Sequence, residues 1–306
     1  MEFLYWLESI RNPVLDAFFS VITYCGDELV FMAVAVILMW CVDKYQGYFM
    51  LFVGFLGTQI NQLLKVTYRI PRPWVKDPNF TIVESAYEAA TGYSFPSGHT
   101  QCSVGTFGAL AVWNKQVWLR VVSIALCILV PLSRMYLGVH TPLDVGVSYL
   151  VAVALIAILY PLTKKLQHNP KGMRIFLAVL ALISLAQTVY MTVTLLNETA
   201  PELQSGLKNA YKMLGAVLGM IAVYELDQRF VRYNVKAVWW AQVLKVVLGL
   251  GLTVGLKELC YAVFGLIPWE PISRFFAYFV MVVFAGAIWP MTFKWFAKLG
   301  HKEEIK

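Results

Sequence analysis

Long apolar runs constrain this chain more than any other feature of its sequence. Three of them read ELVFMAVAVILMWCV, VSYLVAVALIAILY and FVMVVFAGAIW. Hydrophobic residues make up 59% of the 306 residues and charged residues only 14%, whereas a soluble domain is about half apolar and about a quarter charged. Runs of this kind span a bilayer as helices. The sequence therefore predicts an all-α, polytopic helical membrane protein and argues against a large soluble helical core.

The apolar runs divide the chain into about nine predicted spans. These are 28–43, 47–66, 98–113, 118–138, 142–162, 173–196, 209–226, 238–264 and 272–297. A shorter apolar piece at 13–24 is either a short buried helix or an interfacial one, because it is too short for a confident span. The longest polar connection, 67–97, joins two spans, and its length indicates a structured functional loop.

Basic residues are divided unevenly between the two faces that alternating spans define. One face collects 14 of the 25 Lys and Arg residues. They are Lys44, Lys115, Arg120, Lys164, Lys165, Lys171, Arg174, Arg229, Arg232, Lys236, Lys294, Lys298, Lys302 and Lys306. We expect this face to be cytoplasmic. The net charge of +7 is then an anchoring charge, so no nucleic-acid partner is expected.

Three sequence pieces are predicted to meet at the opposite, outer face. They are KVTYRIPRP at 65–73, PSGH at 96–99 and SRMYLGVHTPLD at 133–144. Each lies at the outer end of a predicted span, although they are far apart along the chain. The basic residues among them depart from the positive-inside trend and need another explanation.

These pieces hold the parts of an anion site. Lys65, Arg72 and Arg134 are three cations; arginine suits a bidentate grip on phosphate oxygens, and lysine acts as a point charge. Ser97 and Gly98 follow a proline and open a helix, where backbone N–H groups and the helix dipole favour an anion. Together they predict a receptacle for a tetrahedral oxyanion.

Two histidines supply the chemistry. Asp144 follows His140 by four residues, so its carboxylate can reach the imidazole and leave the other ring nitrogen nucleophilic. His99 has no such partner nearby in sequence and is suited to general acid–base catalysis. We therefore expect phosphoryl transfer in which His140 attacks phosphorus and His99 protonates the leaving group, then activates water.

The motifs Lys65-x6-Arg72-Pro73, Pro96-Ser97-Gly98-His99 and Ser133-Arg134-x5-His140-x3-Asp144 resemble the three signatures of the type 2 phosphatidic acid phosphatase superfamily. The resemblance implies that His140 is the nucleophile, that His99 protonates the leaving group and that Asp144 supports His140. It implies phosphate binding by five further residues: Lys65, Arg72, Ser97, Gly98 and Arg134.

The resemblance also implies an architecture. A six-helix phosphatase core holding all three motifs would cover 1–163, and about four additional C-terminal transmembrane helices of unknown role would occupy 164–306. It implies a reaction without metal or cofactor, in agreement with five cysteines that lack metal-ligand spacing. The superfamily includes soluble vanadium haloperoxidases, but the membrane composition argues against that branch. The stretch FFSVITYCGDELVF and the extra helices resemble the sphingosine-1-phosphate phosphatase and glucose-6-phosphatase side.

We therefore expect a membrane-embedded lipid phosphatase whose partners are the bilayer and a lipid phosphate. Candidate substrates are undecaprenyl diphosphate, phosphatidic acid, phosphatidylglycerophosphate and sphingoid phosphates, with a polyprenyl diphosphate favoured. The expected location is a bacterial inner membrane with the site on the outer, periplasmic side. Three alternatives stay open: a lipid phosphotransferase, a phosphatase of a soluble sugar phosphate, and a transporter with a vestigial site.

Several other residues are candidates without an assigned role. Arg69 and Lys76 carry charge near the site but fall outside the motif positions. An ionisable residue inside a membrane span is a candidate for a functional role. Here these residues are Lys245, Lys257 and Glu258. Candidates for a lid or a headgroup pocket in the long loop are Tyr87, Glu88, Tyr93 and Phe95.

Overall fold

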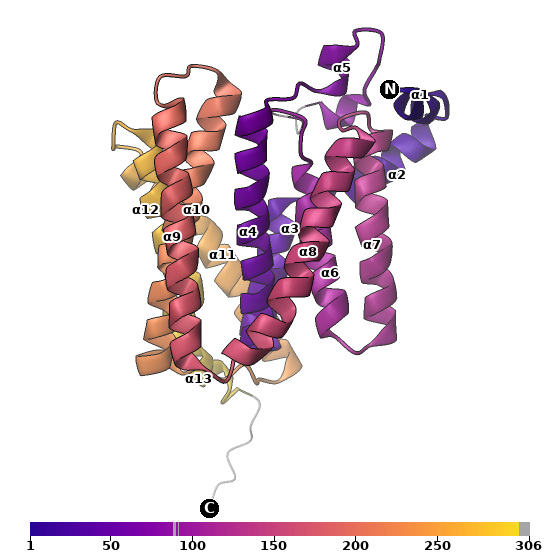
Figure 1. The fold of residues 1–306 in the computed structure, drawn as a ribbon. Helices are drawn as coiled ribbons and strands as arrows, with labels where there is room; N and C mark the ends of the chain where they lie inside the picture. The colour runs from indigo at the N-terminus through magenta and orange to yellow at the C-terminus, as the bar shows by residue number, and fades with distance from the viewer. Residues whose placement is uncertain (88–89, 91, 300–306) are drawn as a thin grey trace, which may run out of the picture. The chain divides into compact units, whose positions relative to one another are not determined.

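The computed structural model describes residues 1–299 except 88, 89 and 91, and within these residues it contains helices and no strand (Figure 1). The all-α fold expected from the sequence is confirmed. The longer helices are α1 (Glu2–Ser9), α2 (Pro13–Tyr24), α3 (Glu28–Cys41), α4 (Lys44–Tyr68), α6 (Gly98–Trp113), α7 (Val117–Tyr136), α8 (Pro142–Leu166), α9 (Pro170–Leu195), α10 (Pro201–Leu226), α11 (Trp239–Phe264) and α12 (Glu270–Val283). The short ones are α5 (Pro73–Lys76), η1 (Glu84–Ala86), η2 (Asp227–Val231), η3 (Phe284–Ile288), η4 (Trp289–Thr292) and α13 (Phe293–Phe296).

Proline opens many of these helices, among them α2, α8, α9 and α10. At the first helical position its fixed φ is already helical, and its missing N–H would have no partner inside the helix. The start of α2 adds a side-chain cap, since Asn12 Oδ1 accepts a hydrogen bond from the Leu15 amide at 3.1 Å. The sequence therefore sets these helix starts through local chemistry.

Six helical segments in the described part of the chain are long and apolar enough to cross a membrane. The helices α2 and α3 meet at a 47° bend and would make a seventh span if they count as one. The predicted apolar piece at 13–24 is thus α2, half of this bent pair. Two predicted spans are not among these membrane-crossing segments. The helix α6 has only 16 residues, and α10 begins with the polar stretch PELQSGLKNAYK.

The chain packs as two compact units, and each unit is built from three separate segments of the sequence. Unit 1 contains Met1–Ala35, Tyr48–Lys165 and Glu198–Gly206. Unit 2 contains Val36–Gly47, Leu166–Asn197 and the chain from Leu207. The division into 1–163 and 164–306 stays a prediction.

Within unit 1, α6 packs against three long helices. It packs along α7, and its glycines allow close approach to two others. A methyl group at Gly105 would lie 3.3 Å from Val53 of α4, and one at Gly108 would lie 2.7 Å from Ile156 of α8. Small residues at such contacts let membrane helices pack closely. This packing holds the start of α6 beside the ends of α4, α7 and α8.

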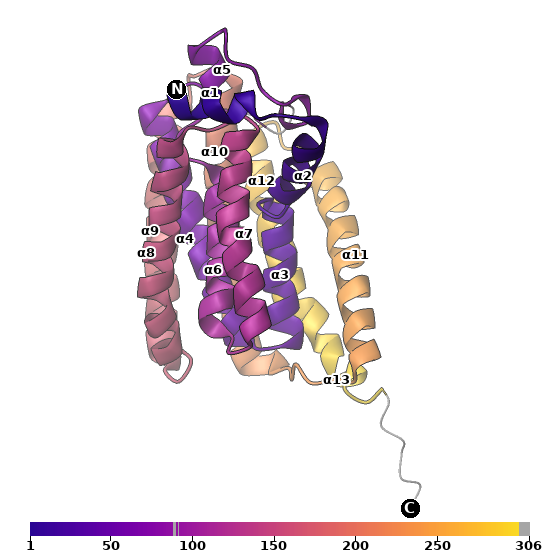
Figure 2. The same ribbon diagram turned by 90° about the vertical axis from the view of Figure 1, so that its right-hand side faces the viewer.

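A small core covers the site end of unit 1. Leu4 and Leu7 of α1 are buried there together with Tyr136 and Val139, and Figure 2 shows α1 lying across the end of α7. Arg11 donates hydrogen bonds to the carbonyl of Tyr136 at 3.1 Å and to that of Thr81 at 2.9 Å. The N-terminal segment thereby ties the long loop to the segment that carries His140.

Unit 2 is held by buried polar contacts around the end of α3. The Trp40 indole N–H donates to the Ala285 carbonyl at 2.8 Å. Lys245 Nζ donates to the Trp40 carbonyl at 2.8 Å, and Lys44 pairs with Asp227 at 2.8 Å. Because buried cations need partners, these contacts give Lys245 and Lys44 a structural role within unit 2.

Candidate active site

The eight predicted site residues all lie at one end of unit 1. Lys65 is in the last turn of α4, and Arg72 immediately precedes α5. Ser97 caps α6, which Gly98 and His99 begin. The remaining three are Arg134 in the last turn of α7, His140 in the following loop and Asp144 in the first turn of α8.

His140 is oriented by a neighbour on each side of its ring. Gly138 has φ +82°, a conformation that favours glycine, and it makes the turn between α7 and His140. Arg72 Nη1 donates to His140 Nε2 at 3.0 Å, and Nδ1 faces Asp144 Oδ2 at 3.6 Å. An Nε2 that accepts from arginine carries a lone pair, so the proton belongs on Nδ1, toward the carboxylate. Nε2 is therefore the nucleophilic nitrogen.

The charges around His140 keep it neutral. Its side chain is only 2% exposed. Burial lowers its pKa well below the ordinary 6.5, and the neighbouring cations Arg72, Arg134 and Lys65 lower it further. A lowered pKa means that the imidazole stays unprotonated, and hence nucleophilic, at neutral pH and below.

Asp144 is held by more than His140. Its Oδ2 accepts hydrogen bonds from Ser94 Oγ at 2.6 Å and from the Thr141 amide at 2.7 Å. Its own carbonyl accepts from the Ser97 amide at 3.1 Å. Ser94 is fully buried and was missed by the sequence reasoning, because a serine ahead of PSGH carries no signal for a partner fifty residues away.

Replacing Ser94 with alanine is expected to slow turnover about tenfold to a hundredfold, the usual cost of removing an outer partner of an active group. The reason is that Asp144 would lose its short hydrogen bond and hold His140 less firmly. Steady-state rates on a lipid phosphate would measure this. The matched control is Ser20→Ala, which removes a serine hydroxyl paired with Ser85 outside the site. Equal rates for Ser94→Ala and wild type would contradict the assignment.

The two arginines and Lys65 supply positive charge. Arg134 is 1% exposed, and its Nη1 donates to Thr23 Oγ1 at 2.7 Å. Its Nε has no hydrogen-bond partner among the residues that the structure describes. Lys65 Nζ donates to the Tyr93 carbonyl at 2.6 Å. A buried guanidinium N–H without a partner is costly unless a ligand satisfies it.

The start of α6 differs in detail from the anion site that the sequence predicts there. The Ser97 amide already donates to Asp144, and the Ser97 hydroxyl accepts from Thr100 Oγ1 at 3.0 Å. Ser97 is thus engaged in holding the turn. A methyl group at Gly98 would meet nothing within 4 Å. The Ser97 hydroxyl keeps its own O–H to donate, and Gly98 is exposed, so the anion contacts expected of both residues stay predictions.

His99 has a carboxylate partner that its sequence neighbourhood does not reveal. Its Nε2 lies 3.2 Å from Asp27 Oδ1, at the junction of α2 and α3. The two residues are far apart in sequence. The stretch FFSVITYCGDELVF contains Asp27, but nothing in its pattern connects that residue to the site.

The unassigned residues near the site divide into paired and exposed ones. Arg69 pairs with Glu198 at 3.1 Å, and Lys76 is exposed. Tyr87 is 63% exposed, whereas Phe95 is buried edge-on against Tyr68. The Tyr93 carbonyl contacts Lys65, as described above. Glu88 lies outside the described residues.

The ionisable residues of α11 make local contacts within unit 2. Lys245 donates to the Trp40 carbonyl, as described above, and to that of Val235 at 3.2 Å. Lys257 lies 3.5 Å from Glu258, and both side chains are exposed. Among the described residues, no group of three or more His, Cys, Asp or Glu could hold a metal ion.

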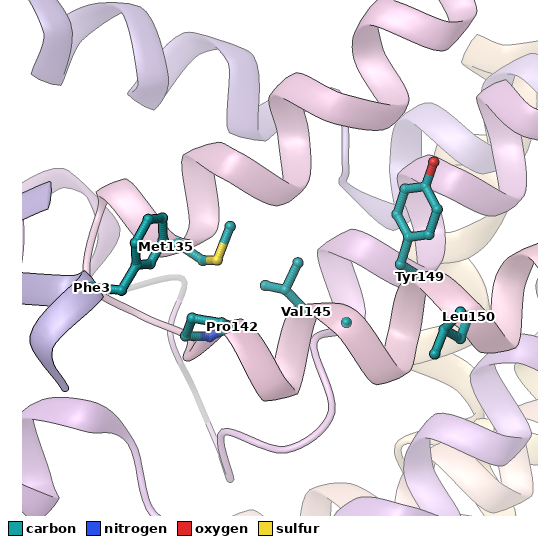
Figure 3. A pocket seen from close by; sticks show the side chains of 7 residues that line it. Phe3, Met135, Pro142, Val145, Tyr149 and Leu150 are labelled. Carbon is teal, nitrogen blue, oxygen red and sulfur yellow. The ribbon is translucent and has the colours of Figure 1, made fainter.

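An apolar pocket of about 640 Å³ opens beside α8 in unit 1 (Figure 3). Phe3 of α1, Met135 of α7 and Val145 and Tyr149 of α8 are among its lining residues. Val145 directly follows Asp144. The same helix therefore carries a catalytic candidate in its first turn and part of the pocket lining.

Known proteins resemble both parts of the chain. The sequence profile of the PAP2 superfamily matches residues 45–168, and that of the "PAP2 superfamily phosphatase, transmembrane extension" matches residues 211–302. The undecaprenyl-diphosphatase BcrC of Bacillus subtilis is 32% identical over 151 residues, covering 47% of this chain and 73% of BcrC.

Two further relatives share shorter fractions of their length. A probable sphingosine-1-phosphate phosphatase of Dictyostelium discoideum is 29% identical over 160 residues, 48% of this chain and 38% of that protein. Phosphatidylglycerophosphatase B of Haemophilus influenzae is 39% identical over 87 residues, 26% of this chain and 36% of that protein. The chain thus spans well under half the length of these two relatives.

Proposed function

Because the chain belongs to the PAP2 superfamily, we propose that it is a membrane-embedded lipid phosphatase. One observation carries the proposal. A buried, neutral His140 presents Nε2 beside Arg72, and among the described residues the buried Nε of Arg134 has no hydrogen-bond partner. A nucleophile next to unsatisfied positive charge suits an anionic phosphorus centre.

In the proposed first step, His140 Nε2 attacks phosphorus and forms an N–P bond as the bond to the leaving oxygen breaks. Arg72 shifts its N–H from Nε2 to a phosphoryl oxygen, and Arg134 and Lys65 offset the charge on the other oxygens. Asp144 accepts a hydrogen bond from Nδ1–H, and its negative charge stabilises the charged phosphohistidine. His99 gives a proton to the leaving oxygen.

In the proposed second step, water attacks the phosphohistidine. His99 takes a proton from the water as the new O–P bond forms and the N–P bond breaks. The products are free phosphate and neutral His140, which again accepts from Arg72. The reaction uses His99 twice, as an acid and then as a base.

The proposed substrate is an amphiphilic lipid with a terminal phosphomonoester or diphosphate. The apolar pocket along α8, the helix that carries Asp144 in its first turn, supports a hydrocarbon tail in the substrate. Among the relatives reported above, BcrC is covered over the largest share of its length, and its name specifies undecaprenyl diphosphate. A polyprenyl diphosphate is therefore the first substrate to test.

We also propose that the site faces the outer side of a bacterial inner membrane. Within unit 1, the loop between α6 and α7 and the end of α8 lie at the end opposite the site (Figure 1). That end carries Lys115, Arg120, Lys164 and Lys165. A basic end favours the cytoplasm, which leaves the site outside.

Purified protein in detergent is expected to release phosphate from at least one lipid phosphate and to be unaffected by EDTA. The panel contains undecaprenyl diphosphate, phosphatidic acid, phosphatidylglycerophosphate, sphingosine 1-phosphate and glucose 6-phosphate. Resistance to EDTA is expected because the phosphate charge is offset by Lys65, Arg72 and Arg134. Free phosphate is the measured product.

The control is the same purification from cells that lack the protein. Release of phosphate from none of the five compounds would overturn the proposal. Release from glucose 6-phosphate alone would replace the lipid by a soluble sugar phosphate. Transfer of the phosphoryl group to a lipid alcohol in place of water would identify a phosphotransferase.

A further inference from the structure

The bend between α2 and α3 reaches into the candidate site, although it belongs to none of the three motifs. Thr23 in the last turn of α2 accepts a hydrogen bond from Arg134 at 2.7 Å. Asp27, just before α3, lies 3.2 Å from His99. The Cys102 thiol donates to the Asp27 carbonyl at 3.6 Å and links the bend to α6. One segment therefore contacts two predicted site residues.

Gly26 makes this approach possible. A methyl group there would lie 2.9 Å from the His99 carbonyl and 2.8 Å from Val130 of α7. Contacts below 3 Å require the neighbours to move, and here one of them is backbone. The bend is thus fitted against the start of α6, and Asp27 is brought to His99 by close packing.

The surrounding charges give the Asp27 carboxylate a specific task. Burial lowers the pKa of His99 below its ordinary value, and the positive charges of Arg134 and Arg72 lower it further. Asp27 acts in the opposite direction, since a carboxylate at hydrogen-bond distance favours the imidazolium. In a site built to attract phosphate, the acid needs such a partner to keep its proton.

The contact also distinguishes the two ring nitrogens of His99. A carboxylate beside Nε2 holds a proton there, which leaves Nδ1 to exchange protons with the substrate. The arrangement mirrors that of His140, where Asp144 faces Nδ1 and leaves Nε2 for phosphorus. The site therefore contains two carboxylate–imidazole pairs with opposite nitrogens facing the carboxylates.

We propose that Asp27 is a positioning residue for the general acid–base His99, acting through the carboxylate contact at Nε2. The inference rests on the proposed phosphatase function and extends it beyond the three motifs. In the first step the His99 imidazolium passes its Nδ1 proton to the leaving oxygen as the P–O bond breaks, and a neutral imidazole still paired with Asp27 remains. In the second step Nδ1 takes a proton from the attacking water, which restores the imidazolium.

The test compares leaving groups of different basicity. Asp27→Asn keeps the shape of the side chain and removes its charge. Turnover of an alkyl phosphate such as phosphatidic acid is expected to fall about tenfold to a hundredfold, because an alkoxide cannot leave without a proton. The release of 4-nitrophenol in the first, single turnover is expected to change less than about threefold, because that leaving group needs no proton and the water step has not yet begun. A purely structural loss would reduce both rates equally.

Two further variants complete the test. Asp27→Glu restores a carboxylate and is expected to recover most of the alkyl phosphate activity. Glu28→Gln removes the adjacent exposed carboxylate and is the matched control, expected to behave as wild type. Wild-type activity of Asp27→Asn on the alkyl ester, equal losses on both esters, or a Glu variant as slow as the Asn variant would each overturn the inference. If wild type does not cleave the aryl ester, the alkyl phosphate activities of Asp27→Asn and Asp27→Glu still test the inference. An inactive wild type would instead refute the proposed function itself.

Discussion

Replacing His140 with alanine is expected to lower turnover by at least about 10⁴-fold, the scale on which loss of a covalent nucleophile acts. His140 supplies the unprotonated nitrogen beside Arg72, and its other ring nitrogen faces Asp144. Phosphate release from the best lipid substrate measures the effect. Because the contacts of His140 with Arg72 and Asp144 lie within the site, the variant should stay folded, with a thermal unfolding midpoint within a few degrees of wild type, about the shift that 1 kcal/mol produces.

The covalent step is tested separately by a single turnover with radiolabelled substrate. Wild-type protein quenched during turnover should carry label that is labile in acid and stable in base, as expected of a phosphohistidine. The His140→Ala protein should carry none. Label of that kind on the alanine variant, or turnover near the wild-type rate, would rule out His140 as the nucleophile.

The motif residues could be predicted from the sequence because their chemistry and spacing are local. The four-residue step from His140 to Asp144 placed both at one helix start, and the structure has them 3.6 Å apart. Arg72 was predicted as a cation for phosphate, and it lies 3.0 Å from His140 Nε2. Their roles in catalysis stay predictions until the variants are measured.

The supporting residues could not be predicted, because their partners come from distant segments. Ser94 meets Asp144, and Asp27 meets His99, only after α2, α6 and α8 have packed. Neither contact has a helical period or a fixed spacing that a sequence pattern would show. The engaged Ser97 amide is a similar case, since its acceptor is the carbonyl of Asp144 on another helix.

The positions of the helices could be predicted from the sequence better than their packing. Apolar runs marked the membrane-crossing segments, because bilayer thickness sets their length. The assembly of unit 2 from separate stretches of the chain depends on contacts such as Trp40 with Ala285. Such contacts join residues hundreds of positions apart, and a hydropathy pattern does not contain them.

Replacing Arg72 with lysine is expected to lower kcat/KM about 10²-fold to 10³-fold, the loss seen when one donor to a developing oxyanion is removed. Arginine here does three things at once: Nε donates to the Gly92 carbonyl at 3.0 Å, and Nη1 donates to the Val139 carbonyl at 2.9 Å and to His140 at 3.0 Å. A lysine ammonium keeps the charge but lacks the planar fork that spans these acceptors and can turn a second N–H to phosphate.

The matched control for this substitution is Arg69→Lys in the same loop. Arg69 pairs with Glu198 through side chains that are both more than a third exposed, and such pairs contribute little. Its rate is expected within about twofold of wild type, a change of less than half a kcal/mol. Inorganic phosphate should inhibit Arg72→Lys more weakly than wild type, because in the proposed mechanism the lost fork would contact phosphate itself. If Arg72→Lys kept full activity and full phosphate inhibition, charge alone at this position would suffice, and the bidentate role of Arg72 would be wrong.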